Sequence, residues 1–216
     1  DKIDELRRIE VKDNNLHIGA MVTHLQLMKS DVVKEKLAVL AAAAEDVGSP
    51  QIRSRGTIGG NICTSSPAGD LLAPLLSYEA GFKLQSAEGE RIVAAEKFFT
   101  GPKRNLMEAD ELLTEIIIPL TENEREGAWV KVGRRKALVI STLTLSVVLE
   151  FESDKIVKAG VAMGSVAPTP VRLGEVEEMM LGGKLSELDY KKLGQEVKAR
   201  INPIDDLRGS KEYRED

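Results

Sequence analysis

Two adjacent glycines inside a polar, hydroxyl-rich stretch constrain this chain more than any other feature of its sequence. The stretch runs from Thr57 to Asp70, reads TIGGNICTSSPAGD, and lies between two apolar helical patterns. Glycine allows the backbone to approach a ligand closely, and successive backbone N–H groups in such a turn form an anion-binding concavity. The stretch therefore predicts a polyphosphate cradle, in which Asp70 can accept hydrogen bonds from sugar hydroxyls. An ordinary surface loop that needs glycine in order to turn explains the same spacing equally well.

Size and charge narrow the class of protein. A chain of 216 residues suits one large domain or two small ones. Its formal net charge of −5 argues against a nucleic-acid-binding protein, which would carry a concentrated basic face. Cys63 is the single cysteine, so an intrachain disulfide or a cysteine-ligated iron–sulfur cluster within this chain is excluded. No apolar run approaches the ~20 residues of a membrane span and the start does not resemble a secretory signal, so we expect a cytoplasmic protein.

The first fifty residues predict a hairpin followed by a helix. Residues 9–12 and 16–20 alternate in polarity around Asp13-Asn14-Asn15, which is typical of a hairpin turn. Apolar residues then keep to one face from Asp31 to Val47, and Gly48 is a suitable residue to end that helix.

Asp70 has two interpretations. It precedes an apolar pattern over residues 71–78, where a carboxylate would cap the first turn of a helix. It can also bind a ribose or ribityl hydroxyl. Both roles can coexist if the stretch presents a sugar at this helix N-terminus.

Short strands are predicted downstream, followed by a change of architecture. Residues 82–85, 91–94 and 112–118 have strand patterns, and the polar residues 122–127 look like a connection between two halves. We therefore expect one domain over residues 1–121 and a second over residues 122–216.

The second half carries the clearest strand signal of the chain. Residues 142–152 and 157–163 alternate in polarity around a short turn and predict a half-buried antiparallel hairpin. Helical patterns follow at residues 176–180 and 190–201. The fold class is α+β, with a mixed ligand-binding half followed by an antiparallel sheet that carries helices.

Several kinds of catalysis find no support in the sequence. His17 and His24 lack a partner at metal-ligand spacing, and no serine lies in a nucleophile elbow. No Walker lysine follows the glycine pair, and the glycine spacing does not match a Rossmann fingerprint. Cys63 is better explained as a small apolar filler than as a reactive thiol.

A basic cluster at residues 131–136 contains Lys131, Arg134, Arg135 and Lys136. Most such clusters are solvated surface. Lys131, however, lies in the strand-like run AWVKV and can point into a cleft, where it would compensate negative charge on a ligand. A positive charge near N1 and O2 of a flavin stabilises the anionic reduced ring.

These residues together resemble a known family. The runs TIGGN (57–61) and SPAGDLLAP (66–74) are similar to the second FAD-binding motif of the flavoprotein subunits of molybdenum hydroxylases. That family includes the medium subunits of xanthine, carbon monoxide and nicotinate dehydrogenases. Further similar segments follow in the family's order: Leu113–Ile116 with Pro119, Lys131–Lys136, Val166–Arg172 and Pro203–Ser210.

The resemblance implies a fold, a cofactor and a set of contacts. Residues 1–121 would form the second part of an FAD-binding domain of the vanillyl-alcohol-oxidase (PCMH) type, followed by the family's C-terminal domain. The FAD pyrophosphate would be held, largely through backbone N–H groups, by Thr57, Ile58, Gly59, Gly60 and Asn61. Thr64 and Asp70 would contact the ribityl or ribose hydroxyls. Leu113 would line the adenine side, and Lys131 would lie near the flavin ring.

The resemblance also implies partners. Electrons would leave a substrate at a molybdopterin cofactor in a large subunit, pass through [2Fe–2S] centres in a small subunit and reach FAD, then NAD⁺ or another acceptor. The family's first glycine-rich motif, similar to Ala-Gly-Gly-Thr, would precede Asp1, and its final helix would follow Tyr213. We therefore expect residues 1–216 alone to hold FAD weakly or not at all. Two alternatives remain: a non-catalytic module that senses a dinucleotide, and a scaffold that docks partner subunits without flavin.

Overall fold

A computed structural model describes residues 3–135 and 138–216 of the chain. The strands are β1 (Ile9–Lys12), β2 (Asn15–Gly19), β3 (Gly81–Gln85), β4 (Glu90–Ala94), β5 (Phe99–Gly101), β6 (Arg104–Asn105), β7 (Leu112–Pro119), β8 (Glu124–Val132), β9 (Leu143–Glu152), β10 (Lys155–Gly164) and β11 (Val171–Arg172).

Two short 3-10 helices, η1 (Asp4–Arg7) and η2 (Leu185–Glu187), accompany the α-helices. The α-helices are α1 (His24–Lys29), α2 (Asp31–Lys36), α3 (Ala38–Glu45), α4 (Pro50–Arg55), α5 (Ile58–Thr64), α6 (Leu72–Ser77), α7 (Ala95–Phe98), α8 (Gly174–Met180), α9 (Tyr190–Arg200) and α10 (Lys211–Glu215).

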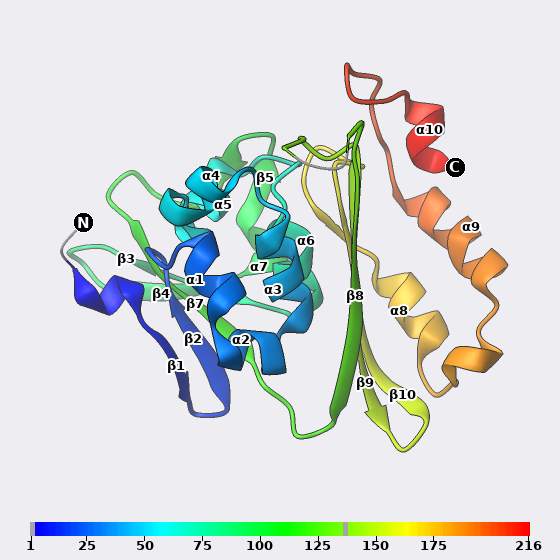
Figure 1. The fold of residues 1–216 in the computed structure, drawn as a ribbon, viewed down its shortest axis with the longest axis horizontal. Helices are drawn as coiled ribbons and strands as arrows, with labels where there is room; N and C mark the ends of the chain where they lie inside the picture. Colours follow the sequence, from blue (N-terminus) through cyan, green and yellow to red (C-terminus); the bar gives the residue numbers. More distant parts are fainter. Residues whose placement is uncertain (1–2, 136–137) are drawn as a thin grey trace.

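Two antiparallel sheets enclose a layer of helices (Figure 1). The first sheet has the strand order β1-β2-β7-β3-β4 and the second has the order β11-β10-β9-β8, while β5 and β6 form a small separate ribbon. Helix α5 contacts the first sheet and helices α3 and α6 contact the second, with α1, α2 and α4 packed beside them, while α8 and α9 lie on the outer side of the second sheet (Figure 1). This is the α+β arrangement that the sequence predicts.

The predicted hairpins are present. β1 pairs with β2 around Asp13 and Asn14, both of which adopt positive φ, as a tight turn requires. β9 and β10 pair along almost their full length, with one irregularity near Ile156.

The predicted helix over residues 31–47 is divided in two, which corrects the sequence interpretation. Leu37 leaves helical geometry (φ −136°, ψ 51°) and is fully buried, so α2 ends and α3 begins at this residue. The hydroxyl of Tyr78 accepts a hydrogen bond from the backbone N–H of Val39, which has no partner in the first turn of α3. Gly48 has φ +47°, but α3 ends at Glu45 with Asp46 as its C-cap, so the helix stops before the predicted end at Val47.

Residues 122–127 are not a free connection, because β8 already begins at Glu124 and pairs with β9 from its first residue. The strand was missed because its first residues are charged and exposed rather than alternating. Backbone pairing with a strong neighbouring strand compensates for a weak sequence pattern here.

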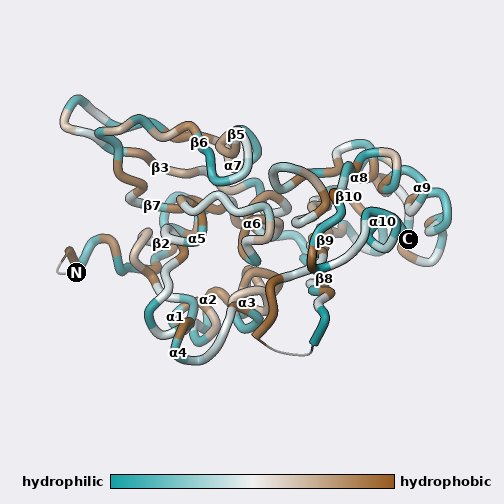
Figure 2. Tube along the Cα trace, turned by 90° about the horizontal axis from the view of Figure 1, so that it is seen from above, coloured by the Kyte–Doolittle hydropathy of each residue, from teal (hydrophilic) through white to brown (hydrophobic). Residues whose placement is uncertain are grey.

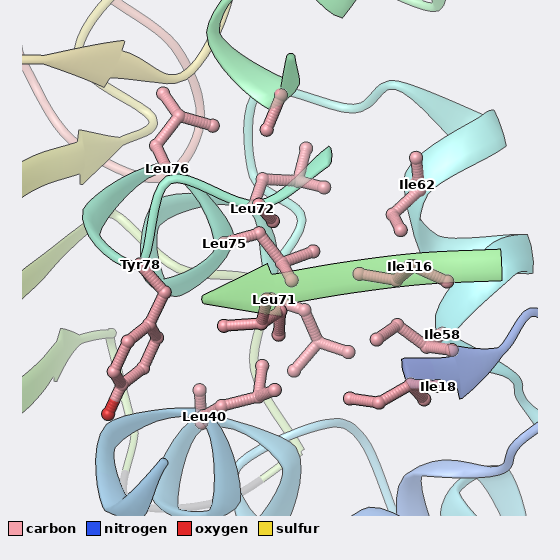
Figure 3. Packing of buried hydrophobic residues seen from close by; sticks show 14 of the residues in the cluster. Ile18, Leu40, Ile58, Ile62, Leu71, Leu72, Leu75, Leu76, Tyr78 and Ile116 are labelled. Carbon is pink, nitrogen blue, oxygen red and sulfur yellow. The ribbon is translucent and has the colours of Figure 1, made fainter. Parts of the chain in front are cut away.

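Helix α6 lies at the centre of the larger hydrophobic core. All of its residues are buried. Figure 3 shows Leu71, Leu72 and Leu75 in a cluster with Ile58 and Ile62 of the α5 segment. A second apolar cluster lies between the β9–β10 hairpin and helices α8 and α9. Figure 2 shows hydrophobic colour around α3 and more hydrophilic colour along α9 and α10.

Two glycines allow the helices to dock tightly on the second sheet. A Cβ on Gly160 of β10 would lie 2.0 Å from the carbonyl oxygen of Ser77 in α6. A Cβ on Gly127 of β8 would lie 2.5 Å from a methyl group of Val39 in α3. Both contacts are impossible for any other residue, so these positions fix how closely the sheet approaches the helical layer.

Candidate functional site

The glycine pair lies in a helix rather than in a loop. Thr57 is the N-cap of α5, and its side chain accepts a hydrogen bond from the backbone N–H of Gly60. The prediction of a nest-like loop is therefore corrected. The sequence obscured the helix because two adjacent glycines have low helix propensity, whereas burial of Ile58 and Ile62 stabilises it.

The first four backbone N–H groups of α5 already have acceptors within the chain. Those of Ile58 and Gly59 donate to the carbonyl oxygens of Val22 and Ala20. Those of Gly60 and Asn61 donate to the side chain and the carbonyl oxygen of Thr57. The expectation that these residues hold a pyrophosphate largely through backbone N–H groups is therefore not supported by the hydrogen bonding.

Side chains remain available on the outer surface of α5. Gly60 is exposed, and Thr64, also exposed, donates its hydroxyl to the carbonyl oxygen of Gly60 at 2.7 Å. The carbonyl oxygen of the Asn61 side chain is buried and has no partner among the described residues. The surface combines two threonine hydroxyls, a primary amide and a position without a side chain, which suits sugar and phosphate oxygens.

Asp70 and Lys131, predicted from separate motifs, form a direct ion pair. Lys131 Nζ lies 2.7 Å from Asp70 Oδ2, and their side chains are 8% and 11% exposed. Asp70 does not cap α6, because that helix begins at Leu72 with Leu71 as its N-cap and no side-chain cap. The predicted capping role is therefore wrong, and the carboxylate is used across the interface between the helical layer and the second sheet.

Burial dominates the titration of Asp70. Removal of the carboxyl group from water raises the pKa of Asp70 to about 6, and the hydrogen bond and charge of Lys131 oppose this rise. The second carboxyl oxygen, Oδ1, is buried without a partner among the described residues. The site thus contains two buried acceptor oxygens without a partner among the described residues, Asn61 Oδ1 and Asp70 Oδ1. A Cβ added to Gly69, the residue before Asp70, would lie 3.2 Å from Asn61 Oδ1.

Two predicted contact residues are core residues. The side chains of Ile58 and Leu113 are 0% and 3% exposed and belong to the larger hydrophobic cluster. Gly59 is also buried, and a Cβ there would lie 2.7 Å from the carbonyl oxygen of Ala20. These three residues shape the support beneath the site, and their contact with a cofactor stays a prediction.

Lys131 also lines a cleft of about 740 Å³ between the end of α3 and the end of β8. Arg53, Arg134 and Arg135 contribute further positive charge, and Glu45 contributes a carboxylate. The expectation that Lys131 faces a cleft is met, but its charge is compensated by Asp70. Lys136 of the predicted basic cluster lies outside the described residues.

Asp46 and Trp129 belong to the site but lie in none of the sequence motifs. Asp46 accepts hydrogen bonds from both Trp129 and Lys131, at 2.8 Å and 2.9 Å. The only available sequence signal is that Trp129 and Lys131 are two residues apart in a strand-like run and therefore share a face. No sequence pattern indicates Asp46 as their common partner, because it lies 83 residues before Trp129 and 85 residues before Lys131.

The remaining candidates have structural roles. Cys63 is half-buried, with its Sγ 3.6 Å from Met107 Sδ, and burial raises the pKa of its thiol, in agreement with a filler role. His24 is buried, and desolvation with the nearby charge of Arg53 lowers its pKa to about 4. Within residues 3–135 and 138–216, the structure contains no helix long and apolar enough to cross a membrane.

Comparison with protein families assigns both halves of the chain. Residues 1–121 match the FAD binding domain in molybdopterin dehydrogenase, and residues 128–216 match the CO dehydrogenase flavoprotein C-terminal domain. The chain belongs to the FAD-binding medium subunits of the molybdenum hydroxylase family.

Individual medium subunits are similar over most of the chain. The nicotinate dehydrogenase FAD-subunit of Eubacterium barkeri is 35% identical over 189 residues, covering 86% of this chain and 64% of that protein. The glyceraldehyde dehydrogenase medium chain of Sulfolobus acidocaldarius is 32% identical over 99% of this chain and 75% of its own length. A solved carbon monoxide dehydrogenase from Hydrogenophaga pseudoflava superposes with a TM-score of 0.94 and 33% identity, covering 99% of this chain and 74% of that one. The chain thus spans 64% to 75% of these three relatives.

The residues at the site fit the sugar and phosphate part of the family's cofactor. The buried oxygens of Asn61 and Asp70 that lack a partner among the described residues, together with the hydroxyls of Thr57 and Thr64, are donor and acceptor types that suit sugar hydroxyls and phosphate oxygens. Contact of these side chains, of Asp70 and of Lys131 with the cofactor stays a prediction.

Proposed function

We propose that this medium subunit holds FAD and transfers electrons. The FAD would receive electrons from a molybdopterin-containing large subunit through a [2Fe–2S] small subunit, and would pass them to NAD⁺ or another acceptor. FAD, when bound, supplies the step between one-electron iron–sulfur carriers and a two-electron acceptor. The hydroxylation chemistry would take place in the large subunit. A cytoplasmic location and a domain division into residues 1–121 and 122–216 belong to the same proposal.

The observation that carries this proposal is the ion pair between Lys131 and Asp70. It joins the segment after α5 to the last residues of β8, and so connects two separate family motifs into one charged site. No packing argument predicts that a lysine on the second sheet meets the end of a glycine-rich segment 61 residues earlier in the chain.

The chain's own residues have distinct roles in this proposal. Thr57 and Asn61 donate hydrogen bonds to phosphate oxygens through a hydroxyl and an amide, because the backbone N–H groups of residues 58–61 already have acceptors. Thr64 and Asp70 accept hydrogen bonds from sugar hydroxyls. Lys131 presents positive charge to the isoalloxazine ring and favours its anionic reduced form.

The test is the visible spectrum and subunit composition of the protein purified from its native host. Flavin absorbance that is bleached by NADH or dithionite, together with co-purifying molybdenum and iron–sulfur subunits, is the expected result. Bleaching by dithionite but not by NADH would select an acceptor other than NAD⁺.

Two alternative functions give different results in the same experiment. A colourless protein that binds an oxidised or reduced dinucleotide without changing its redox state would indicate a sensing module. Stable partner binding with neither flavin nor nucleotide would indicate a docking scaffold.

A further inference from the structure

Asp46 is the meeting point of two side chains from the same strand. Trp129 Nε1 donates to Asp46 Oδ2 at 2.8 Å, and Lys131 Nζ donates to the backbone carbonyl oxygen of Asp46 at 2.9 Å. Trp129 and Lys131 are alternate residues of β8 and therefore project from one face. The side chain of Asp46 thus holds the strand next to Lys131, while its main chain holds the lysine itself.

The acceptor on Asp46 is itself firmly placed. Asp46 is the C-cap of α3, and its backbone N–H donates to carbonyl oxygens of the last helical turn. The guanidinium of Arg53 donates to the next two carbonyl oxygens, those of Val47 and Gly48. Cations at a helix C-terminus are electrostatically favourable, so this end of α3 receives both Lys131 and Arg53.

The ammonium of Lys131 has three protons, and two of them have acceptors. One is directed to the Asp46 carbonyl oxygen and one to Asp70 Oδ2 at 2.7 Å. Among the described residues the third has no acceptor in the chain. Two fixed acceptors on different elements determine the direction of that third N–H bond.

We propose that Asp46 and Trp129 are positioning residues that fix the Lys131 ammonium on the end of α3 and leave its third N–H for the ligand of this site. The ligand part of this inference rests on the proposed function, whereas the placement of Lys131 does not. Trp129 acts through Asp46, and Asp46 acts through its main chain, so neither residue needs to touch the cofactor.

The test compares variants that remove or retain the indole hydrogen bond. Trp129→Phe keeps the aromatic packing and loses only the N–H donor, whereas Asp46→Asn keeps an oxygen acceptor for the indole. The purified chain is labelled with acetic anhydride, and modification of Lys131 is quantified by mass spectrometry. Lys184, which is 41% exposed in a separate ion pair with Asp154, is the internal reference.

We expect Trp129→Phe to raise the labelling rate of Lys131 by about fivefold, the effect of losing one ordinary hydrogen bond. We expect Asp46→Asn to label within about twofold of the native chain, with Lys184 unchanged in both. Equal labelling of Lys131 in Trp129→Phe and the native chain would overturn the positioning role.

A second readout uses the flavin in the purified multi-subunit assembly. We expect its midpoint potential to fall in Trp129→Phe, in the same direction as in Lys131→Met and by less. In Asp46→Asn it should rise, because a nearby negative charge is removed while the lysine stays in place. Potentials unchanged in both variants would contradict the inference. An assembly without flavin would instead refute the proposed function, and the labelling result would still decide the placement of Lys131.

Discussion

The two halves of the site are built in different ways. In the α5 half, the first four backbone N–H groups donate to Thr57 and to Ala20 and Val22, which follow β2 of the first sheet. The Lys131–Asp70 half depends on two layers meeting, and leaves a carboxyl oxygen without a partner among the described residues. Helix α5 therefore supplies a frame that is hydrogen-bonded within the first domain, whereas the charge at the site depends on how the second sheet docks.

The largest expected effect comes from preventing that docking. Gly160→Ala places a Cβ against the Ser77 carbonyl oxygen and should lower the free energy of unfolding by about 3 kcal/mol, because backbone must move. Urea unfolding measures it. Gly194→Ala, in the open interior of α9, is the matched control and should stabilise by about 0.5 to 1 kcal/mol. Equal effects of the two variants would show that the layers do not approach as closely as described.

His24, near the α5 half, should make the free energy of unfolding depend on pH by a similar amount. The pKa of His24 is lowered from 6.5 to about 4, so the folded chain disfavours the charged ring. The contribution of neutral His24 to the free energy of unfolding is fully present above pH 6.5. It is lost as the pH falls toward 4, and the total loss is about 3 kcal/mol. His24→Gln should remove this loss in urea titrations between pH 4 and 7. An unchanged pH slope in that variant would contradict the assignment.

In the Lys131–Asp70 half of the site, Asp70 should make stability change with pH in the opposite direction. Its pKa is raised to about 6, so the folded chain binds a proton more tightly than the unfolded chain. This contribution therefore favours the folded state at low pH and is lost as the pH rises from about 4 to about 6. Asp70→Asn should make stability rise more steeply with pH over that range than in the native chain. The same slope in both proteins would indicate an ordinary carboxyl group.

Removing the ammonium of Lys131 should lower the free energy of unfolding by less than Gly160→Ala does. Lys131→Met leaves the Asp70 carboxylate buried without its cation, and we expect a loss of about 2 kcal/mol at pH 7, limited because Asp70 can take up a proton. The double variant Lys131→Met with Asp70→Asn should recover part of it. A double variant less stable than either single variant would show that the two residues do not act as a pair.

The smallest effect is expected at the N-cap of α5. Thr57→Ala should cost about 1 kcal/mol, because the N–H of Gly60 loses its acceptor. Thr57→Ser keeps the hydroxyl and should stay within about 0.3 kcal/mol of the native chain. Calorimetric unfolding distinguishes the two, and equal losses would mean that the threonine methyl group rather than the cap stabilises the helix.

The sequence predicts the site better where residues are neighbours along the chain than where they meet in space. The alternation around residues 9–20 and 142–163 predicts both hairpins, because local pattern and pairing agree there. The helical state of Gly59 and Gly60 could not be predicted, since burial of Ile58 and Ile62 overrides their low propensity.

The predicted capping role of Asp70 is wrong for a similar reason. A carboxylate just before an apolar run is typical of an N-cap, but a lysine from the other sheet binds it instead. The family motifs indicate Asp70 and Lys131 separately, and the structure brings their side chains into contact. Asp46 lies outside those motifs, so only the folded chain reveals it.

Trp129, the single tryptophan of the chain, offers a direct test of whether the outer surface of α5 and the Lys131–Asp70 pair form one FAD site. FAD is titrated into the purified chain while tryptophan fluorescence is recorded, in native protein and in Asn61→Ala, whose side chain lies on α5. We expect saturable quenching of Trp129 fluorescence by FAD. We expect the FAD affinity to be at least about tenfold weaker in Asn61→Ala, because charge-assisted hydrogen bonds to the cofactor are lost. Saturable FAD binding that leaves Trp129 fluorescence unchanged, or that Asn61→Ala does not weaken, would contradict the single FAD site.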